Sequence, residues 1–148
     1  MTTRTPAAGD LAAEFLPHAA PFLLLDRILA IDGVTGRFSK GITGTDPLVG
    51  PRGELSPLLM VEAMAQGAGI VLTARDPSLR GRVAMLAAID RCEVSGVAQA
   101  GEVLEVEITV VRRYATMARV RGRAQVGARP CVSAAITLAF GSEAAGPR

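Results

Sequence analysis

The fold is decided by one apolar stretch, residues 57–72, which reads PLLMVEAMAQGAGIVL. Only Glu62 and Gln66 interrupt it, and because they are four residues apart they lie on one face of a helix. Ser56 is a suitable N-cap, and proline is favoured at the first helical position that follows it. A helix that is apolar on every side is a buried helix. We therefore expect a buried helix over residues 57–74, ended by Asp76-Pro77.

Glu62 is the main candidate for chemistry in this helix. A carboxylate in apolar surroundings is costly unless it is paired or has a task, and general acid or base catalysis is one such task. The alternative is a structural carboxyl group that is hydrogen-bonded to backbone. Gln66, one turn further on, could orient Glu62, bind substrate, or make a structural hydrogen bond to the sheet.

The bulk composition indicates one globular domain over residues 1–148, with a core at about 14–140. Of the 148 residues, 49% are hydrophobic but only 3% are aromatic, so the core must be aliphatic. A net charge of +2 is too small to indicate a nucleic-acid partner. Cys92 and Cys131 have no metal or redox spacing, and we expect both to be buried thiols in a cytoplasmic protein. Strands follow the apolar helix, so we expect no membrane span.

Six strand-like segments flank the helix. Residues 22–31 and a second run ending near residue 43 are joined by a turn at Asp32-Gly33. After the helix come runs over 83–94, 103–113, 116–126 and 131–140, two of which alternate strictly between apolar and polar residues, as half-buried antiparallel strands do. This order predicts an α+β fold in which an antiparallel sheet wraps one long central helix. Gly67 and Gly69 would let the sheet backbone approach that helix closely.

Four segments, in order, resemble the FabZ-type 3-hydroxyacyl-ACP dehydratases of the hotdog superfamily. Residues 16–27, LPHAAPFLLLDR, resemble the family's opening L-P-H-R-x-P-F-L-L-V-D-R, and residues 61–66, VEAMAQ, resemble its helix signature I-E-A-M-A-Q. Residues 88–91, AIDR, are similar to G-I-D-K, and residues 101–106, GEVLEV, to G-D-x-L-x-L-E-V. The resemblance covers roughly residues 14–140.

This resemblance implies a hotdog fold and a homodimer or higher oligomer, with a tunnel at the subunit interface for an acyl-phosphopantetheine chain. It implies acyl thioesters of acyl carrier protein or coenzyme A as ligands, the carrier protein as a partner, fatty-acid or related biosynthesis as the setting, and no cofactor or metal. In the family, a histidine in G-H-F-P-G takes the Cα proton, and the helix glutamate, matched here by Glu62, helps the 3-hydroxyl leave. The glycine of M-P-G donates its N–H to the thioester carbonyl.

The chain departs from the family pattern before the helix. Residues 45–48, TDPL, match the family's N-E-P-F, but residues 49–54, VGPRGE, contain no G-H-F-P-G, and counting back from Glu62 puts Leu48 at the histidine position. The M-P-G step becomes residues 55–57, LSP, and Pro57 has no N–H to donate. The amides of Leu58 and Leu59 at the helix N-terminus could stand in, which makes both candidates for substrate binding.

His18, the only histidine, is the second catalytic candidate. It matches the opening histidine of the family, which lies near the tunnel mouth and has no catalytic role there. Histidine is suited to proton transfer near neutral pH. The resemblance favours the other interpretation, in which hydrogen bonds from His18 pin the N-terminal loop. On that interpretation its removal costs less than the roughly 100-fold typical of a general base.

Arg119, Arg121 and Arg123 form a basic stripe along one expected strand. The stripe could dock an acidic carrier protein, but cross-strand pairing is favoured, since a turn near residue 114 would bring Glu107 opposite Arg123. Three functions remain open: a diverged dehydratase, a hotdog thioesterase, or a non-catalytic thioester-binding subunit paired with an active homologue. Without the family histidine, we expect weak dehydration of simple 3-hydroxyacyl thioesters.

Overall fold

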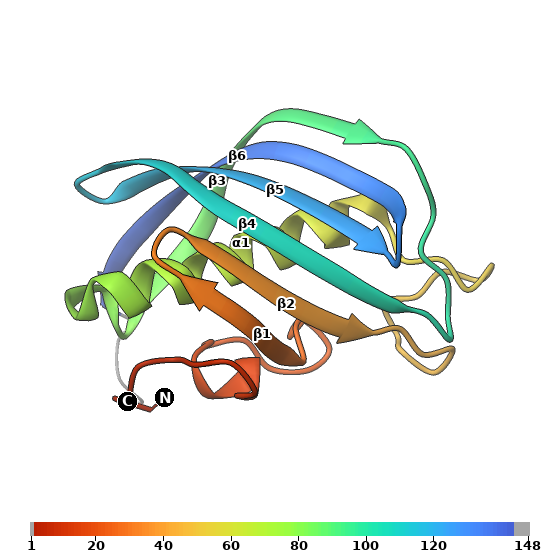
Figure 1. Ribbon diagram of the computed structural model, residues 1–148, viewed down its shortest axis with the longest axis horizontal. Coiled ribbons are helices and arrows are strands. Elements are labelled where there is room, and N and C mark those ends of the chain that lie inside the picture. Colours follow the sequence, from red (N-terminus) through yellow and green to blue (C-terminus); the bar gives the residue numbers. More distant parts are fainter. Residues whose placement is uncertain (1, 144–148) are drawn as a thin grey trace.

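A curved antiparallel sheet wraps around one long helix in the computed structural model (Figure 1). The structure describes residues 2–143, so residue 1 and residues 144–148 of the expected domain lie outside the described residues. The sheet has six strands in the order β1-β2-β4-β5-β6-β3, which confirms the α+β hotdog architecture. The elements are β1 (Arg27–Asp32), β2 (Thr35–Gly41), α1 (Pro57–Arg75), β3 (Arg82–Val94), β4 (Val103–Tyr114), β5 (Met117–Val126) and β6 (Arg129–Glu143), with short 3-10 helices at Ala12–Glu14 and Pro77–Leu79.

The ends of α1 are fixed by local chemistry. At its start the Ser56 hydroxyl accepts a hydrogen bond from the amide of Leu58 at 3.3 Å, and Pro57 occupies the first helical position. At its end the Asp76 amide donates to the carbonyl of Leu72. By length and composition α1 could cross a membrane, but 67% of its most apolar window is buried within the protein. The apolar composition of α1 is therefore that of a helix buried in a protein core.

Residues 22–26 do not form the strand expected for them, and β1 begins only at Arg27. The reason is a side chain of α1. Gln66 Nε2 donates to the carbonyl of Phe22 at 2.7 Å, and Gln66 Oε1 accepts from the amide of Leu24 at 3.0 Å. Because these backbone groups are satisfied by the helix, the apolar run enters the core as an irregular segment, with Leu24 and Leu25 buried.

The helix glycines make room for side chains rather than for the sheet backbone. A Cβ atom at Gly67 would lie 2.7 Å from Cε2 of Phe38, a buried side chain of β2. A Cβ atom at Gly69 would meet Cβ of Ala84 at 3.5 Å, which is an ordinary contact. The expected backbone approach was therefore wrong at both positions. Gly67 is needed because an aromatic ring occupies the space beside it.

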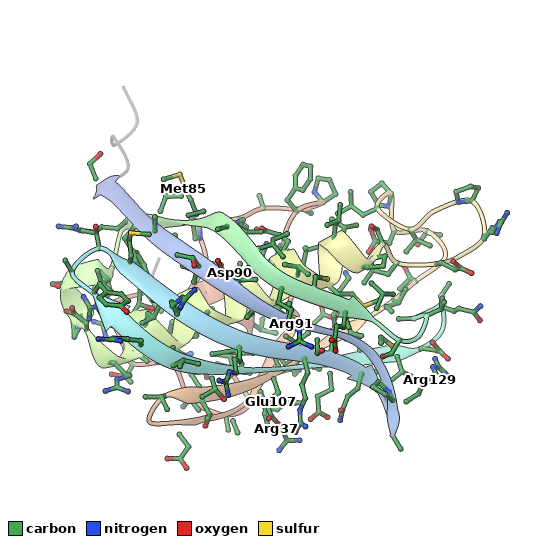
Figure 2. All side chains as sticks on the ribbon, turned by 90° about the horizontal axis from the view of Figure 1, so that it is seen from above. Arg37, Met85, Asp90, Arg91, Glu107 and Arg129 are labelled. Atoms are coloured by element: carbon green, nitrogen blue, oxygen red, sulfur yellow. The ribbon has the colours of Figure 1, made fainter. Side chains whose placement is uncertain are left out.

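Charged side chains pair across the strands on the outer face of the sheet (Figure 2). Arg123 contacts Glu107 at 3.0 Å, which confirms the predicted pair, and Arg37 contacts Glu105 at 2.8 Å. Arg119 lies 3.9 Å from Asp90. Arg121, the third arginine of the stripe, has no ion pair within residues 2–143. The stripe is thus largely a ladder of opposite charges, each pair of small energetic value.

The two cysteines differ in burial, so one expectation was wrong. Cys131 in β6 is buried, but Cys92 in β3 is exposed. The difference follows from the sheet order, because β3 is an edge strand that pairs only with β6. The second half of β3 faces solvent in the single chain.

Candidate active site

A pocket runs along one face of α1, between the N-terminal loop and the start of β3. The helix contributes residues from successive turns of this face, which are Glu62, Ala65, Gln66, Gly69 and Thr73. The rest of the lining comes from the N-terminal segment (Phe15, Leu16, Pro17, His18), from the start of β3 (Gly81, Arg82, Ala84) and from Phe140 of β6. Most of these residues are apolar, so the few polar ones stand out as candidates for chemistry.

His18 and Glu62, which are far apart in sequence, meet in this pocket. Nε2 of His18 lies 3.7 Å from Oε1 of Glu62. This is longer than a hydrogen bond, but catalytic pairs are often loose before a substrate binds. The other ring nitrogen, Nδ1, is buried and has no hydrogen-bond partner among the residues that the structure describes. Nδ1 of His18 therefore does not pin the loop, contrary to the favoured interpretation, and it is the other nitrogen, Nε2, that faces the carboxylate of Glu62.

Glu62 is less buried than the surrounding helix sequence indicates. Its side chain is 34% exposed, whereas its neighbours Val61 and Ala63 are fully buried. The expectation of a carboxylate enclosed by the core was wrong because the Glu62 face of the helix borders the pocket rather than the sheet. The carboxylate is thus open to a ligand.

Gln66 holds the two sides of the pocket together. Its side-chain amide binds the backbone of Phe22 and Leu24, and its Nε2 also lies 3.4 Å from Oε1 of Glu62. These contacts tie the segment that follows His18 to the helix turn that follows Glu62. The geometry supports the orienting role and the structural role together, because the amide of Gln66 already has protein partners. Direct substrate binding by Gln66 stays a prediction.

Leu58 and Leu59 are not placed to act as oxyanion donors at this pocket. The amide of Leu58 donates to the Ser56 hydroxyl at 3.3 Å, and the amide of Leu59 donates to the Ser56 carbonyl at 3.0 Å. Neither residue lines the pocket, and Leu58, in the first turn of α1, lies about 6 Å along the helix axis before Glu62. Ser56 already accepts hydrogen bonds from the two amides that were expected to stand in for the missing glycine N–H.

The segment at the position of the family's histidine loop closes on itself. Val49 bridges to Leu55, and the amide of Gly50 donates to the carbonyl of Glu54 at 2.9 Å. Leu48 and its neighbours line a separate hollow at the start of α1, not the pocket of Glu62. Among the described residues this segment contributes no acid or base to the lining of the Glu62 pocket, and the histidine there comes from the N-terminal loop.

Sequence reasoning missed Thr73, Arg82 and Phe140 as pocket residues. Thr73 lies eleven residues after Glu62, so helical periodicity could have found it. Arg82 gave no signal, because an arginine at the first position of a strand is typical of an exposed residue. Its Nε is nevertheless buried, with no hydrogen-bond partner within the described chain. No group of three or more His, Cys, Asp or Glu side chains that could hold a metal occurs in residues 2–143.

The sequence matches a known family over most of its length. Residues 11–145 match the family described as ApeP-like, ApeP dehydratase. The chain is 32% identical over 133 residues to the 3-hydroxyacyl-[acyl-carrier-protein] dehydratase FabZ of Bacillus velezensis, covering 86% of this chain and 94% of that protein. It is 34% identical over 131 residues to FabZ of Pelotomaculum thermopropionicum, covering 85% and 93%.

Solved structures share the fold at low sequence identity. The dehydratase heterocomplex ApeI:P from Xenorhabdus doucetiae contains a chain that matches with a TM-score of 0.81 at 16% identity, covering 90% of this chain and 92% of that one. A hypothetical thioesterase with coenzyme A from Streptococcus pneumoniae matches with a TM-score of 0.62 at 11% identity, covering 80% and 87%. At these identities the likeness concerns the fold alone. The family is shown by the sequence matches: this chain belongs to the ApeP-like dehydratases and is related to the FabZ enzymes across most of its length.

Proposed function

We propose that this chain dehydrates 3-hydroxyacyl thioesters, carried on acyl carrier protein or coenzyme A, to 2-enoyl thioesters. The observation that carries the proposal is the separation of 3.7 Å between His18 Nε2 and Glu62 Oε1. A base and an acid side by side in a mostly apolar pocket are the two groups that elimination of water needs. Membership of the ApeP-like dehydratases and the likeness to FabZ support the same reaction.

The two side chains divide the proton transfers. Nε2 of His18 removes the proton from C2, and the electrons of that C–H bond form the double bond between C2 and C3. The bond from C3 to the hydroxyl oxygen breaks, and the leaving oxygen takes a proton from the Glu62 carboxyl group, so that one water is released. The pair is then left as imidazolium and carboxylate, and transfer of the proton from His18 to Glu62 restores both groups for the next cycle.

Stabilisation of the thioester carbonyl is the weak part of this site. Pro57 cannot donate a backbone hydrogen bond, and Ser56 already binds the amides of Leu58 and Leu59. Loss of one such donor typically costs about two to three orders of magnitude in kcat. We therefore keep the expectation that turnover of simple substrates is weaker than that of a relative with the G-H-F-P-G and M-P-G segments.

One experiment separates the three functions that the sequence left open. The purified protein is incubated with a 3-hydroxyacyl-CoA and with the saturated acyl-CoA of equal length, while enoyl absorbance and free thiol are followed together. Enoyl formation from the 3-hydroxyacyl substrate supports the dehydratase. Thiol release from both substrates without enoyl formation would show a thioesterase in which Glu62 activates water. Binding without either product would show a non-catalytic subunit.

We propose further that the chain assembles through β3 as a homodimer. In the single chain this edge strand exposes Met85 (51%), Ile89 (41%) and Val94 (58%), and Met85 lies at that edge of the sheet in Figure 2. Apolar side chains on an unpaired edge strand favour pairing with another strand. The ApeI:P heterocomplex gives a second candidate, in which a homologous dehydratase takes the place of the second copy. Sedimentation of the purified chain at micromolar concentration tests the homodimer.

We also propose that the protein works in the cytoplasm. Both cysteines are free thiols, as expected where thiols are kept reduced. A cell fractionation that found the protein outside the cytoplasm would contradict this.

A further inference from the structure

The pocket holds a second charged side chain, at the end opposite Glu62 and His18. The helix face that lines it runs from Glu62 to Thr73, eleven residues later, which corresponds to about 16 Å along the helix axis. Arg82, the first residue of β3, also lines this pocket, and the short connection from the end of α1 at Arg75 to β3 places it toward the Thr73 end. Between the two ends the helix lining is Ala65, Gly69 and Gln66, and the amide of Gln66 is bonded to the backbone of Phe22 and Leu24.

Arg82 belongs to the face of β3 that looks toward the helix. Alternate residues of a strand share a face, and Ala84, two residues on, lies against Gly69 of α1. Nε of Arg82 is buried, and among the side chains and backbone groups that the structure describes it has no hydrogen-bond partner. A buried donor without a partner is rare and costly, so a ligand that accepts its hydrogen bond would be favoured.

The chemistry of Arg82 defines which ligand group fits. A guanidinium group stays charged and presents planar donors that match a carboxylate bidentately. The neighbouring Thr73 hydroxyl donates to the carbonyls of Gly69 and Ile70 at 3.0 and 3.1 Å, so its hydrogen is used within the helix. Nε of Arg82 is therefore a charged hydrogen-bond donor that this end of the pocket can offer to a ligand.

We infer that Arg82 determines substrate specificity by binding a carboxylate at the far end of the acyl chain while Glu62 and His18 act at its thioester end. This inference rests on the proposed function for the direction in which the chain lies. The preferred substrate class is then a 3-hydroxyacyl thioester whose acyl chain ends in a carboxylate rather than in a methyl group. The methylene groups would lie along the residues between the two ends, where the cavity of about 20 Å³ must widen to admit them.

The test measures binding rather than turnover. Dissociation constants are measured by titration calorimetry for dodecanoyl-CoA and for its ω-carboxy counterpart, both of which lack the 3-hydroxyl group. The variants are Arg82→Met, Arg82→Lys and Arg121→Met. The last removes the same charge from Arg121, which does not line the pocket of Glu62 and Arg82. Circular dichroism confirms that each variant is folded.

The wild type should bind the ω-carboxy thioester about tenfold more tightly than the methyl-ended one, because a hydrogen bond to a charged group contributes about that factor. Arg82→Met should abolish the preference, Arg82→Lys should retain part of it, and Arg121→Met should retain all of it. No preference in the wild type would overturn the inference. So would an equal loss of affinity for both probes in Arg82→Met, which would place the contact at the thioester end.

The inference and the proposed function can fail separately. A chain-end preference that depends on Arg82, with no enoyl formed from either class of 3-hydroxyacyl substrate, would remove the dehydratase and leave the binding site. Enoyl formation at equal rates and affinities for both chain ends would remove the role of Arg82 and leave the dehydratase.

Discussion

Replacing His18 by alanine tests whether this pocket contains one catalytic group or two. Its Nε2 is 3.7 Å from the Glu62 carboxylate, and it is the only histidine of the chain. A general base typically contributes about two to four orders of magnitude to rate. The sequence resemblance favours a smaller loss of rate than this. We nevertheless expect kcat to fall at least about 100-fold, because the ring faces Glu62 and Nδ1 is not bonded to any described residue.

The fold should survive this substitution. The His18 side chain is 22% exposed, and it makes no hydrogen bond through Nδ1 within the described residues, so the change should lie within about 1 kcal/mol of unfolding free energy. The assay is single-turnover formation of the enoyl thioester, with wild type, His18→Ala, Glu62→Gln and the double variant compared at one pH. If the two groups act as a unit, the double variant should lose little more than the worse single variant.

The outcome that refutes the reasoning is specific. If His18→Ala is folded and its kcat stays within about tenfold of wild type, the histidine is not the base. Glu62 would then act alone or through a water molecule. A double variant whose losses multiply would show that the two groups act independently rather than as a pair.

Three further changes test the surroundings of the site. Gly67→Ala places a Cβ 2.7 Å from an aromatic carbon of β2, so thermal unfolding should show a loss of about 1–3 kcal/mol. Lys40→Met removes the ammonium group that lies 3.1 Å from the carboxylate of Asp46 in a partly buried pair. Urea unfolding should show that the free energy of unfolding falls by about 3 kcal/mol. An unchanged free energy of unfolding would mean that solvent screens the pair. Hydrogen bonds, first those from Ser78, lower the pKa of Asp76 from 3.8 to about 2. The ionised carboxylate therefore stabilises the folded protein above pH 3.8, and this contribution is lost as the pH falls toward 2. Asp76→Asn should make the free energy of unfolding depend less on pH in that window.

The ends of the central helix could be predicted because their signals are local. Ser56 and the Asp76-Pro77 step bound α1 within one residue of the expected 57–74. The pairing of Glu107 with Arg123 was found from a turn near residue 114, although the register shifts by one residue between Arg112 and Val110 before the strands reach this pair. The helix ends are determined by a few adjacent residues, whereas the strand pair also depends on this irregularity.

The irregular segment before β1 could not be predicted from its own composition. Residues 22–25 are as apolar as a strand, yet their backbone partners are on Gln66, which is 44 residues from Phe22 in sequence. The only trace of this contact is a glutamine inside an apolar helix, and that observation does not say which backbone the amide binds. The burial of Nε of Arg82 likewise depends on how β3 starts beside α1.

The position of the histidine follows from that same contact. In this chain the segment before α1 closes as a short turn and lines a separate hollow, so within residues 2–143 it contributes no acid or base to the pocket of Glu62. The loop that carries His18 approaches the other side of the same helix face, and Gln66 binds the backbone just beyond it. A carboxylate on one face of a helix can be reached from either flank, because the reaction requires only that acid and base lie within reach of adjacent substrate carbons. The G-H-F-P-G histidine is missing, and the proposed base in its place is His18, whose loop precedes the backbone that Gln66 binds.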